Sequence, residues 1–297
     1  MLIANPIYDV VFHYLMEDIE VAKQLIGHII DQQIIHLEPN PTVVPHKTAT
    51  RYHVYRMDYA ATIKTDKDEE YKVIIEIQKA SIIDDILRFR TYLAKQYSAY
   101  IKREVRDKRA THQTRYRKDK KKLTLPIISI YFLGDKLEHL EDAFIKVQRH
   151  YYNGITDEKI NTKENFIEQL THDSYIIQIP YLSQQSRTEL EEILSIFNQH
   201  YILDTKHAHT LNFPDHATSP ALKLMIKRLL QAQLNEEMEA IMLLEDEQLD
   251  KAAELEQALL DKEKERMAKE KERIAKETAL QENERLIEIL KKQGIDY

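Results

Sequence analysis

Two acidic residues lie in adjacent β-like segments and could together bind a divalent metal ion. Asp58 lies within Arg51–Thr65 (RYHVYRMDYAATIKT), which is rich in tyrosine, valine, isoleucine and threonine, and Glu76 lies within Tyr71–Ala80 (YKVIIEIQKA). Such compositions are typical of strands, and the short polar stretch TDKDEE between them favours an antiparallel hairpin. The sequence therefore predicts that the two acids lie close together on neighbouring strands.

Glu76 is a candidate metal ligand because its carboxylate lies in an apolar run. A carboxylate in such a run costs free energy unless it is paired or binds a metal. Side chains alternate along a strand, so Glu76 and Gln78 share one face. Asp58, Glu76 and Gln78 could then supply the hard oxygen ligands that suit Mg²⁺ or Mn²⁺. The alternatives are a surface position for Asp58, an ion pair between Glu76 and an arginine, and a simple hydrogen bond from Gln78 to Glu76.

A divalent cation at such a site would support one kind of chemistry in particular. It can polarise a phosphodiester oxygen and lower the pKa of an attacking water. Phosphodiester cleavage near neutral pH needs both effects. The paired acids therefore indicate metal-dependent phosphodiester hydrolysis.

The composition argues against several other kinds of site. The 297 residues include only four glycines, which are not clustered, so glycine-rich phosphate loops are not expected. The chain has no cysteine, which excludes disulfides, cysteine nucleophiles and cysteine metal sites, and suits a reducing cytosol. His200, His207 and His209 show no regular ligand spacing with supporting carboxylates.

The sequence predicts a cytoplasmic protein without a membrane segment. It starts MLIANPIYDV, which lacks the basic start and apolar run of a secretory signal. No stretch of about 18 apolar residues is present, so we expect no membrane span.

The net charge of −7 is unevenly distributed along the chain. Residues 102–122 hold 11 Lys and Arg against 3 Asp and Glu, whereas residues 236–297 hold 11 against 19. A basic patch of this kind could follow a DNA backbone, with binding that weakens as salt rises. The alternative is a solvated basic loop. The residues expected to contact DNA are Lys102, Arg103, Arg106, Arg115 and Arg117.

The remaining segments predict an α/β protein around the two acids. Apolar residues at helical spacing predict helices over Pro6–Ile30, broken near Asp18, Asp84–Glu104, Arg187–Ile202 and Pro220–Leu244. Further strands are expected over Leu125–Gly134, which resembles a central strand, and Ile176–Ile179. Residues 38–50 contain three prolines and are expected to form a loop.

The last 60 residues are dominated by Glu, Lys, Leu and Ala and predict a helix. Leu260, Met267 and Ile274 recur every seven residues, but the partner heptad position is mostly charged. The pattern fits either a solvated single helix or a weak coiled coil that binds a partner. The second interpretation would allow a homo-oligomer.

Four motifs in chain order resemble the nuclease-family transposases of the PD-(D/E)XK superfamily, which include the recombination-promoting nucleases. That family carries NP-x-x-D-x-x-F near the start, an R-x-D strand, an I-E-I-Q strand and a helix with R-x-R-x-Y. The resemblance covers about residues 5–150. The matching residues are Asn5, Pro6, Asp9 and Phe12, then Arg56 and Asp58, then Ile75, Glu76, Ile77 and Gln78, then Arg88, Arg90 and Tyr92.

The resemblance implies a fold and a domain organisation. The expected fold is an α/β restriction-endonuclease-like αβββαβ core over residues 1–180. A helical extension over 181–235 and a charged C-terminal helix over 236–297 would follow it.

The resemblance also implies an activity. The chain would be a magnesium-dependent DNA endonuclease linked to mobile elements, recombination or defence, with Asp58 and Glu76 as metal ligands. Gln78 would complete or orient the site. The wider superfamily usually has lysine at this position, and glutamine is normal in the transposase-like subfamily.

Four further residues are candidates for the site. Asp9 could add an acid from the first helix, or could be an ordinary first-turn acid. Arg88 and Arg90 could bind phosphate or support the carboxylates, or could lie on a solvated helix face. Gln96, about two turns beyond Arg88, could face the same site. The alternative functions are a DNA-binding protein on the same fold that does not cleave, and an assembly protein that acts through its C-terminal helix.

Overall fold

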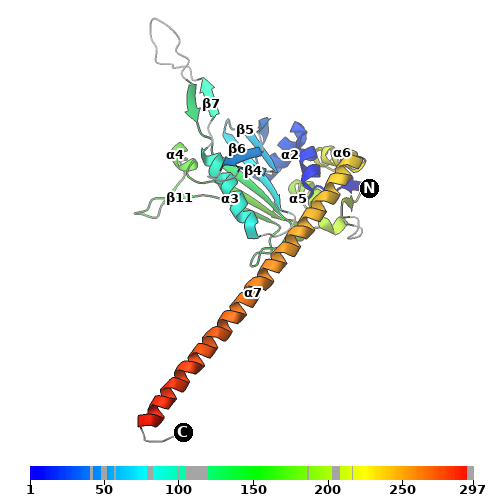
Figure 1. Cartoon of the computed structure of the whole chain (residues 1–297). Helices are drawn as coiled ribbons and strands as arrows, with labels where there is room; N and C mark the ends of the chain where they lie inside the picture. Colours follow the sequence, from blue (N-terminus) through cyan, green and yellow to red (C-terminus); the bar gives the residue numbers. More distant parts are fainter. Residues whose placement is uncertain are drawn as a thin grey trace. The chain divides into compact units, whose positions relative to one another are not determined.

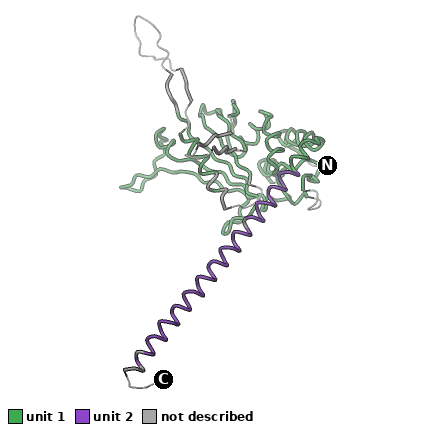
Figure 2. The backbone as a smooth tube through the Cα atoms, viewed as in Figure 1, with its two compact units in different colours: residues 1–242 green, residues 243–297 purple. Residues whose placement is uncertain are grey.

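The structure, a computed structural model, divides the chain into two compact units. It describes residues 1–40, 43–47, 52–56, 58–78, 83–98, 101–104, 120–185, 187–202, 208–215 and 217–292. The first unit is Met1–Met242 and the second is Leu243–Tyr297 (Figure 2).

The first unit is built on a mixed six-stranded sheet (Figure 1). In spatial order its strands are β10 (Phe144–Val147), β13 (Asp173–Gln178), β9 (Ile127–Leu133), β6 (Glu70–Gln78), β5 (Tyr59–Thr65) and β2 (Ile34–Pro39). Strands β2, β5 and β6 pair antiparallel, β6, β9 and β13 run parallel, and β10 returns antiparallel at one edge. The predicted α/β class, the antiparallel pairing of the two acid-bearing segments and the central strand near residues 125–134 are confirmed.

Helices lie on both faces of this sheet. Helix α3 (Ile83–Ser98) covers one face, where Ile74 of β6 packs with Phe89 and Tyr92. The neighbouring residues Val73 and Ile75 belong to the large core on the other face, because side chains alternate along a strand. The helices of that core are α1 (Asp9–Met16), α2 (Ile19–Ile30), α5 (Glu189–Leu194) and α6 (Pro220–Gln233).

Helix α3 explains why β6 and β9 are parallel. Parallel neighbours need a crossover connection, and α3 carries the chain back along the sheet between them. In chain order, the elements that build this part are helices, three antiparallel strands, a helix and a parallel strand. Glu76 lies in β6, the strand that enters this crossover, and Asp58 lies at the bend before the neighbouring strand β5.

The break predicted near Asp18 is confirmed by the start of α2. The Asp18 side chain accepts hydrogen bonds from the main-chain N–H groups of Glu20 and Val21, at 3.0 and 3.3 Å. A side-chain acceptor of this kind satisfies donors that a helix start leaves without partners. The two helices therefore separate at a capping residue.

Smaller elements surround the sheet. Strand β1 (Leu2–Ala4) pairs with β14 (Thr210–Asn212) and ties the start of the chain to the segment before α6. Three further hairpins pair β3 (Val43–Lys47) with β4 (Tyr52–Arg56), β7 (Ile101–Glu104) with β8 (Lys120–Leu123), and β11 (Tyr151–Tyr152) with β12 (Lys159–Ile160). The short helices are α4 (Asn165–Glu168) and the 3₁₀ turns η1 (Ile179–Tyr181), η2 (Ser195–Phe197) and η3 (Gln199–Tyr201).

Four expectations about these elements were wrong. The proline-rich loop contains β3, because Pro45 lies in a two-stranded hairpin, where a missing N–H is tolerated. The strand expected over residues 51–65 is divided into β4 and β5 by a bend at Asp58. The helix expected to reach Glu104 ends at Ser98 and is followed by β7. The helix expected over 187–202 is α5 followed by two 3₁₀ turns.

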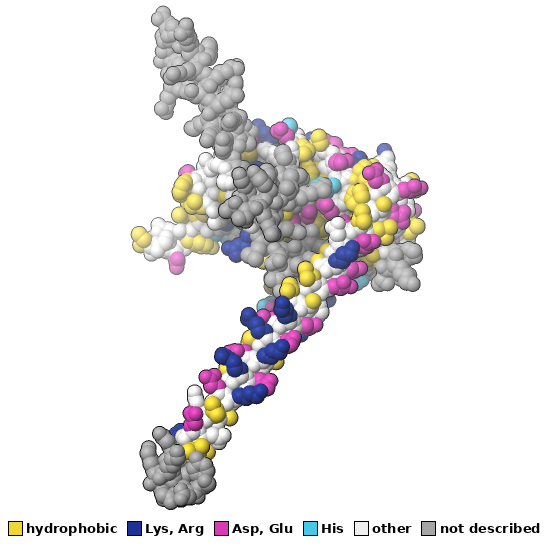
Figure 3. Space-filling view, viewed as in Figure 1, with side chains coloured by type: hydrophobic (Ala, Val, Ile, Leu, Met, Phe, Trp, Pro, Cys, Tyr) yellow, Lys and Arg dark blue, Asp and Glu magenta, His cyan; other side chains and the backbone are white. Residues whose placement is uncertain are grey.

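The second unit continues helix α7 (Glu236–Lys292), whose first residues belong to the first unit. Figure 3 shows basic, acidic and hydrophobic side chains interspersed along this helix. The predicted C-terminal helix is thus confirmed. Within the described part of the chain, no helix has both the length and the apolar character needed to cross a membrane.

Candidate functional site

Asp58 and Glu76 meet at the end of the β5–β6 ladder. The antiparallel register pairs Tyr59 with Ile75, and one more step in the same register sets position 58 opposite position 76. The two acids therefore lie at the same end of the β5–β6 ladder, Asp58 at the bend before β5 and Glu76 within β6.

A hydrogen bond fixes the Asp58 carboxylate beside Glu76. Asp58 Oδ2 accepts the main-chain N–H of Ile77 at 2.5 Å. Ile77 directly follows Glu76, so the carboxylate lies against the peptide group that joins those two residues. Hydrogen bonds to an ionised acceptor are short and strong, so this contact holds the carboxylate in one orientation.

Glu76 is a buried acid in an apolar strand. It is only 3% exposed, and its neighbours Ile75 and Ile77 are also buried. Glu76 is two residues from Ile74 in β6, so its side chain points to the same face as Ile74, the face that α3 covers. Charges in such a water-poor site interact more strongly with a ligand than they would in bulk water.

Aromatic side chains cover the face around Glu76. The parallel register sets Tyr131 of β9 directly beside Glu76. The ring of Phe89 on α3 lies 4.1 Å, centroid to centroid, from the ring of Tyr131. Phe89 and Tyr131 lie within the predicted helix 84–104 and the predicted strand 125–134, but the sequence does not reveal the β6–β9 register that brings them to the site.

Helix α3 runs back along the sheet, and this separates Gln96 from the acids. Phe89 contacts Tyr131, which lies beside Glu76. Further along α3, the Tyr97 hydroxyl forms a hydrogen bond with His172 Nδ1 at 2.6 Å. The β9–β13 register continued one step sets His172 beside Ile127, which pairs with Lys72. Lys72 is four residues before Glu76, which is about 13 Å along the strand. Gln96 is buried but lies nearer the His172 end.

The side chains of two other site candidates fall outside the described residues. Gln78 is the last residue of β6, two residues after Glu76. Arg88 directly precedes Phe89 on α3, so its backbone lies at the Glu76 end of the helix. Arg90 is described and is exposed on the outer side of α3. It therefore stays a candidate for binding a ligand from solvent.

Asp9 lies in the other helical layer. It occupies the first turn of α1, and its Oδ1 lies 3.1 Å from His13 Nε2. Helix α1 packs on the sheet face opposite α3, where Phe12 contacts Phe132. The structure thus brings Asp58 and the backbone at Glu76 together, whereas α1, which carries Asp9, packs on the face of the sheet opposite α3.

The predicted DNA-binding residues lie in and beyond β7. Lys102 and Arg103 are in this strand, where the register pairs them with Lys122 and Lys121 of β8. Arg106, Arg115 and Arg117 lie outside the described residues. Two of the four printed backbone pairs of this hairpin therefore join basic positions, and Glu104 pairs with Lys120.

The donor set of the acidic pair fits a hard cation. Among the described residues, no group of three or more His, Asp or Glu side chains gathers in a metal-binding arrangement. Mg²⁺ does not need one, since it commonly binds through one or two carboxylates and keeps several waters. Burial raises the pKa of Tyr59, next to Asp58, to about 12, so this phenol stays protonated near neutral pH.

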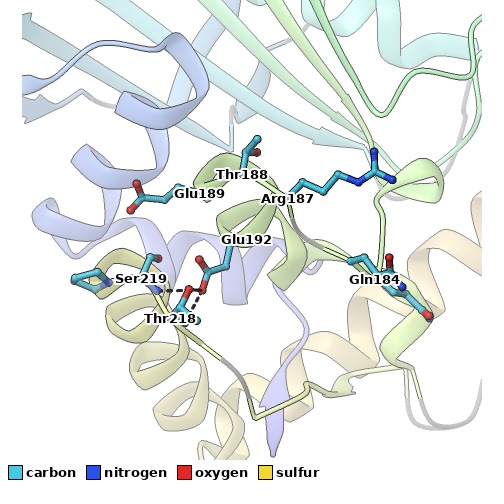
Figure 4. Close-up of a pocket in the computed structure, with 9 residues that line it drawn as sticks. Gln184, Arg187, Thr188, Glu189, Glu192, Thr218 and Ser219 are labelled. Carbon is cyan, nitrogen blue, oxygen red and sulfur yellow. Dashed lines mark hydrogen bonds between the residues drawn. The ribbon is translucent and has the colours of Figure 1, made fainter.

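A separate cavity between α5 and α6 contains none of the predicted residues. It has a volume of about 710 Å³ and is lined by residues such as Gln184, Arg187 and Glu192 (Figure 4). Glu192 Oε1 accepts hydrogen bonds from the Thr218 and Ser219 N–H groups at 2.5 and 3.0 Å. These contacts fix the segment that enters α6, so we assign Glu192 a structural role.

Comparisons of the chain with protein-family models, curated proteins and solved structures found no match.

Proposed function

We propose that the protein is a DNA endonuclease that hydrolyses phosphodiester bonds with Mg²⁺ or Mn²⁺ held by Asp58 and Glu76. The observation that carries the proposal is the 2.5 Å contact that fixes the Asp58 carboxylate at the peptide following Glu76. Two carboxylates at neighbouring positions supply the oxygen ligands that suit these cations. The proposed setting is the cytoplasm, in the biology of mobile elements, recombination or defence.

The order of elements supports a restriction-endonuclease-like core. The resemblance to PD-(D/E)XK nucleases implies a helix, three strands, a helix and a further strand, with the acids on two neighbouring strands. The chain has helices α1 and α2, the antiparallel strands β2, β5 and β6, helix α3 and the parallel strand β9. Asp58 precedes β5 and Glu76 lies in β6, the second and third strands of this order.

The chain's own groups would orient the reaction. When bound, the cation would polarise the scissile phosphodiester and favour ionisation of the attacking water. The Ile77 N–H holds the Asp58 carboxylate in place, so this ligand needs little reorganisation when the cation binds. The amide of Gln78 could hydrogen-bond a water or Glu76, but it is neutral and cannot supply the charge of a lysine.

The basic hairpin supports a polyanionic substrate. In β7 and β8 the register sets Lys102 opposite Lys122 and Arg103 opposite Lys121. Basic residues at these positions favour a DNA backbone as the partner, and they would make binding strongly salt-dependent.

Cleavage of supercoiled plasmid tests the proposal. The full chain is expected to nick or cut the plasmid with Mg²⁺ or Mn²⁺ and to be inactive with EDTA. Asp58→Asn and Glu76→Gln are expected to be inactive, whereas the control Glu70→Gln keeps activity. Glu70 is the first residue of the same strand as Glu76. Equal cleavage by all four proteins would point to a contaminating nuclease and contradict the proposal.

A second candidate function is DNA binding without cleavage. The pairing of basic residues across β7 and β8 favours it independently of the acids. It predicts salt-dependent DNA binding by the wild type and by Asp58→Asn alike, with no metal-dependent cleavage by either. A gel-shift titration beside the plasmid assay separates the two functions.

A further inference from the structure

Helix α7 carries a narrow apolar stripe in the second unit. The C-terminal stripe consists of Leu260, Met267 and Ile274, spaced by seven residues, which are 44%, 51% and 52% exposed. Seven residues are nearly two turns of an α-helix, so the three side chains lie along one line of its surface. The three residues thus form one apolar row that extends over two heptads.

The helix does not need the stripe for its own formation. Ion pairs at i,i+3 and i,i+4 spacing run beside it, such as Glu265–Lys269, Glu270–Arg273 and Glu272–Lys276. Pairs at this spacing support an isolated helix. The exposed apolar residues are therefore available for contact with another surface.

The two sides of the stripe carry opposite charge. Three residues after each stripe residue comes a glutamate, namely Glu263, Glu270 or Glu277. Four residues after each comes Lys264, Lys271 or Thr278. At 100° per residue, i+3 lies on one side of a stripe residue and i+4 on the other. The stripe thus has an acidic flank and a basic flank.

We infer that the C-terminal stripe binds the same stripe of a second copy of this chain, with the two helices parallel and in register. A twofold axis parallel to the helices sets the acidic flank of one copy against the basic flank of the other. Glu263 and Glu270 of each copy then face Lys264 and Lys271 of the other. An antiparallel pair would instead set acid against acid and base against base. The charge pattern therefore selects the parallel arrangement.

The C-terminal stripe has no second apolar row beside it, so the pairing is expected to be weak. Ordinary coiled coils bury two apolar positions per heptad, whereas this stripe supplies one. The pairing is therefore expected to be reversible and salt-sensitive, because exposed ion pairs are screened by salt. It does not depend on the proposed nuclease activity.

Sedimentation of the full chain at several concentrations tests the pairing. The wild type is expected to reach twice its 35.2 kDa chain mass. Leu260→Glu is expected to raise the dissociation constant about tenfold or more. The matched control is Leu259→Glu. Leu259 is 59% exposed and points about 100° away from Leu260, so this variant should leave the dissociation constant unchanged. Circular dichroism checks that both variants stay helical.

Two results would overturn the inference. One is a wild type that stays monomeric throughout the concentration series. The other is equal behaviour of the Leu260→Glu and Leu259→Glu variants, which would show that the stripe is not the contact.

Disulfide trapping tests the orientation, and a chain without cysteine suits it. In a parallel, in-register pair, Leu260→Cys and Ile274→Cys should each form a disulfide-linked dimer of identical chains. Disulfides need Cα atoms within about 7 Å, and the two positions are about 21 Å apart along the helix. An antiparallel pair can therefore link at most one of these variants to itself. Links between Leu260→Cys and Ile274→Cys chains in a mixture would contradict the parallel pairing.

Discussion

Asp58 Oδ2 accepts the main-chain N–H of Ile77 at 2.5 Å, and Ile77 is the residue that follows Glu76. This contact links the bend before β5 to the end of β6 and sets one acid at the backbone of the other. The contact also gives the Asp58 carboxylate a structural role, besides any role in binding a ligand. Substitutions at Asp58 can separate the two roles.

Asp58→Asn is expected to lose cleavage while keeping the fold. The amide oxygen of asparagine can still accept the Ile77 N–H, so the free energy of unfolding should change by less than about 1 kcal/mol. Cleavage should fall by roughly 100-fold or more, because a charged ligand is lost. Asp58→Ala should lose cleavage and also about 1.5 kcal/mol of stability. Urea unfolding and the plasmid assay measure the two effects, and an active Asp58→Asn protein would contradict the assignment.

Mg²⁺ is expected to stabilise the wild type against unfolding. A ligand that binds only the folded state adds about 2.7 kcal/mol at 100 times its dissociation constant. The shift in Tm between Mg²⁺ and EDTA should be kept in Glu70→Gln and lost in Glu76→Gln. If the Tm of Glu76→Gln shifted with Mg²⁺ as much as that of the wild type, Glu76 would not be a ligand of the cation.

Phe89→Ala is expected to loosen the cover over the site. Phe89 is 3% exposed and contacts Tyr131, so its truncation should cost about 3 kcal/mol of stability. The control Ile86→Ala removes an exposed side chain of the same helix and should change stability by no more than about 0.5 kcal/mol. Chemical unfolding of both variants checks this, and equal losses would mean that α3 does not pack as described.

The Tyr97–His172 contact predicts an acid-sensitive attachment of α3. Burial, and then the charge of Arg149, lower the pKa of His172 below its usual 6.5, against the opposing effect of Asp173. The unfolded chain therefore binds a proton at His172 more readily than the folded chain does. The contribution of His172 to stability is complete above pH 6.5 and is lost as the pH falls from 6.5 towards the lower folded value.

His172→Gln is expected to flatten this part of the stability profile. The difference in free energy of unfolding between pH 7.5 and pH 5.5 should be smaller in the variant than in the wild type. Tyr97→Phe should cost about 1 kcal/mol near neutral pH through the lost hydrogen bond. An unchanged pH profile in His172→Gln would contradict the role of this histidine.

The sequence predicted the elements better than their connections. The capping residue Asp18, the β5–β6 hairpin and the apolar strand β9 have local signals that tertiary contacts did not override. The bend at Asp58 has no such signal, because it lies inside an unbroken β-like stretch and depends on a contact with Ile77. Strand β3 was missed because its prolines favour a loop unless a partner strand is known.

The candidate site was predictable only in part for the same reason. The apolar run around Glu76 is visible in the sequence, and so is its spacing from Asp58. The position of Tyr131 beside Glu76 depends on the register of a parallel pair, which no local pattern encodes. The distance of Gln96 from the acids depends on the direction of α3 along the sheet.

Direct titration with Mn²⁺, followed by the electron paramagnetic resonance signal of the unbound ion, is the most direct test of the shared cation site. The wild type and Glu70→Gln are expected to bind one Mn²⁺ with the same affinity, competed by Mg²⁺. Asp58→Asn and Glu76→Gln should each lose this binding, because both carboxylates contribute to one site. Unchanged Mn²⁺ binding in either of these two variants would contradict the account.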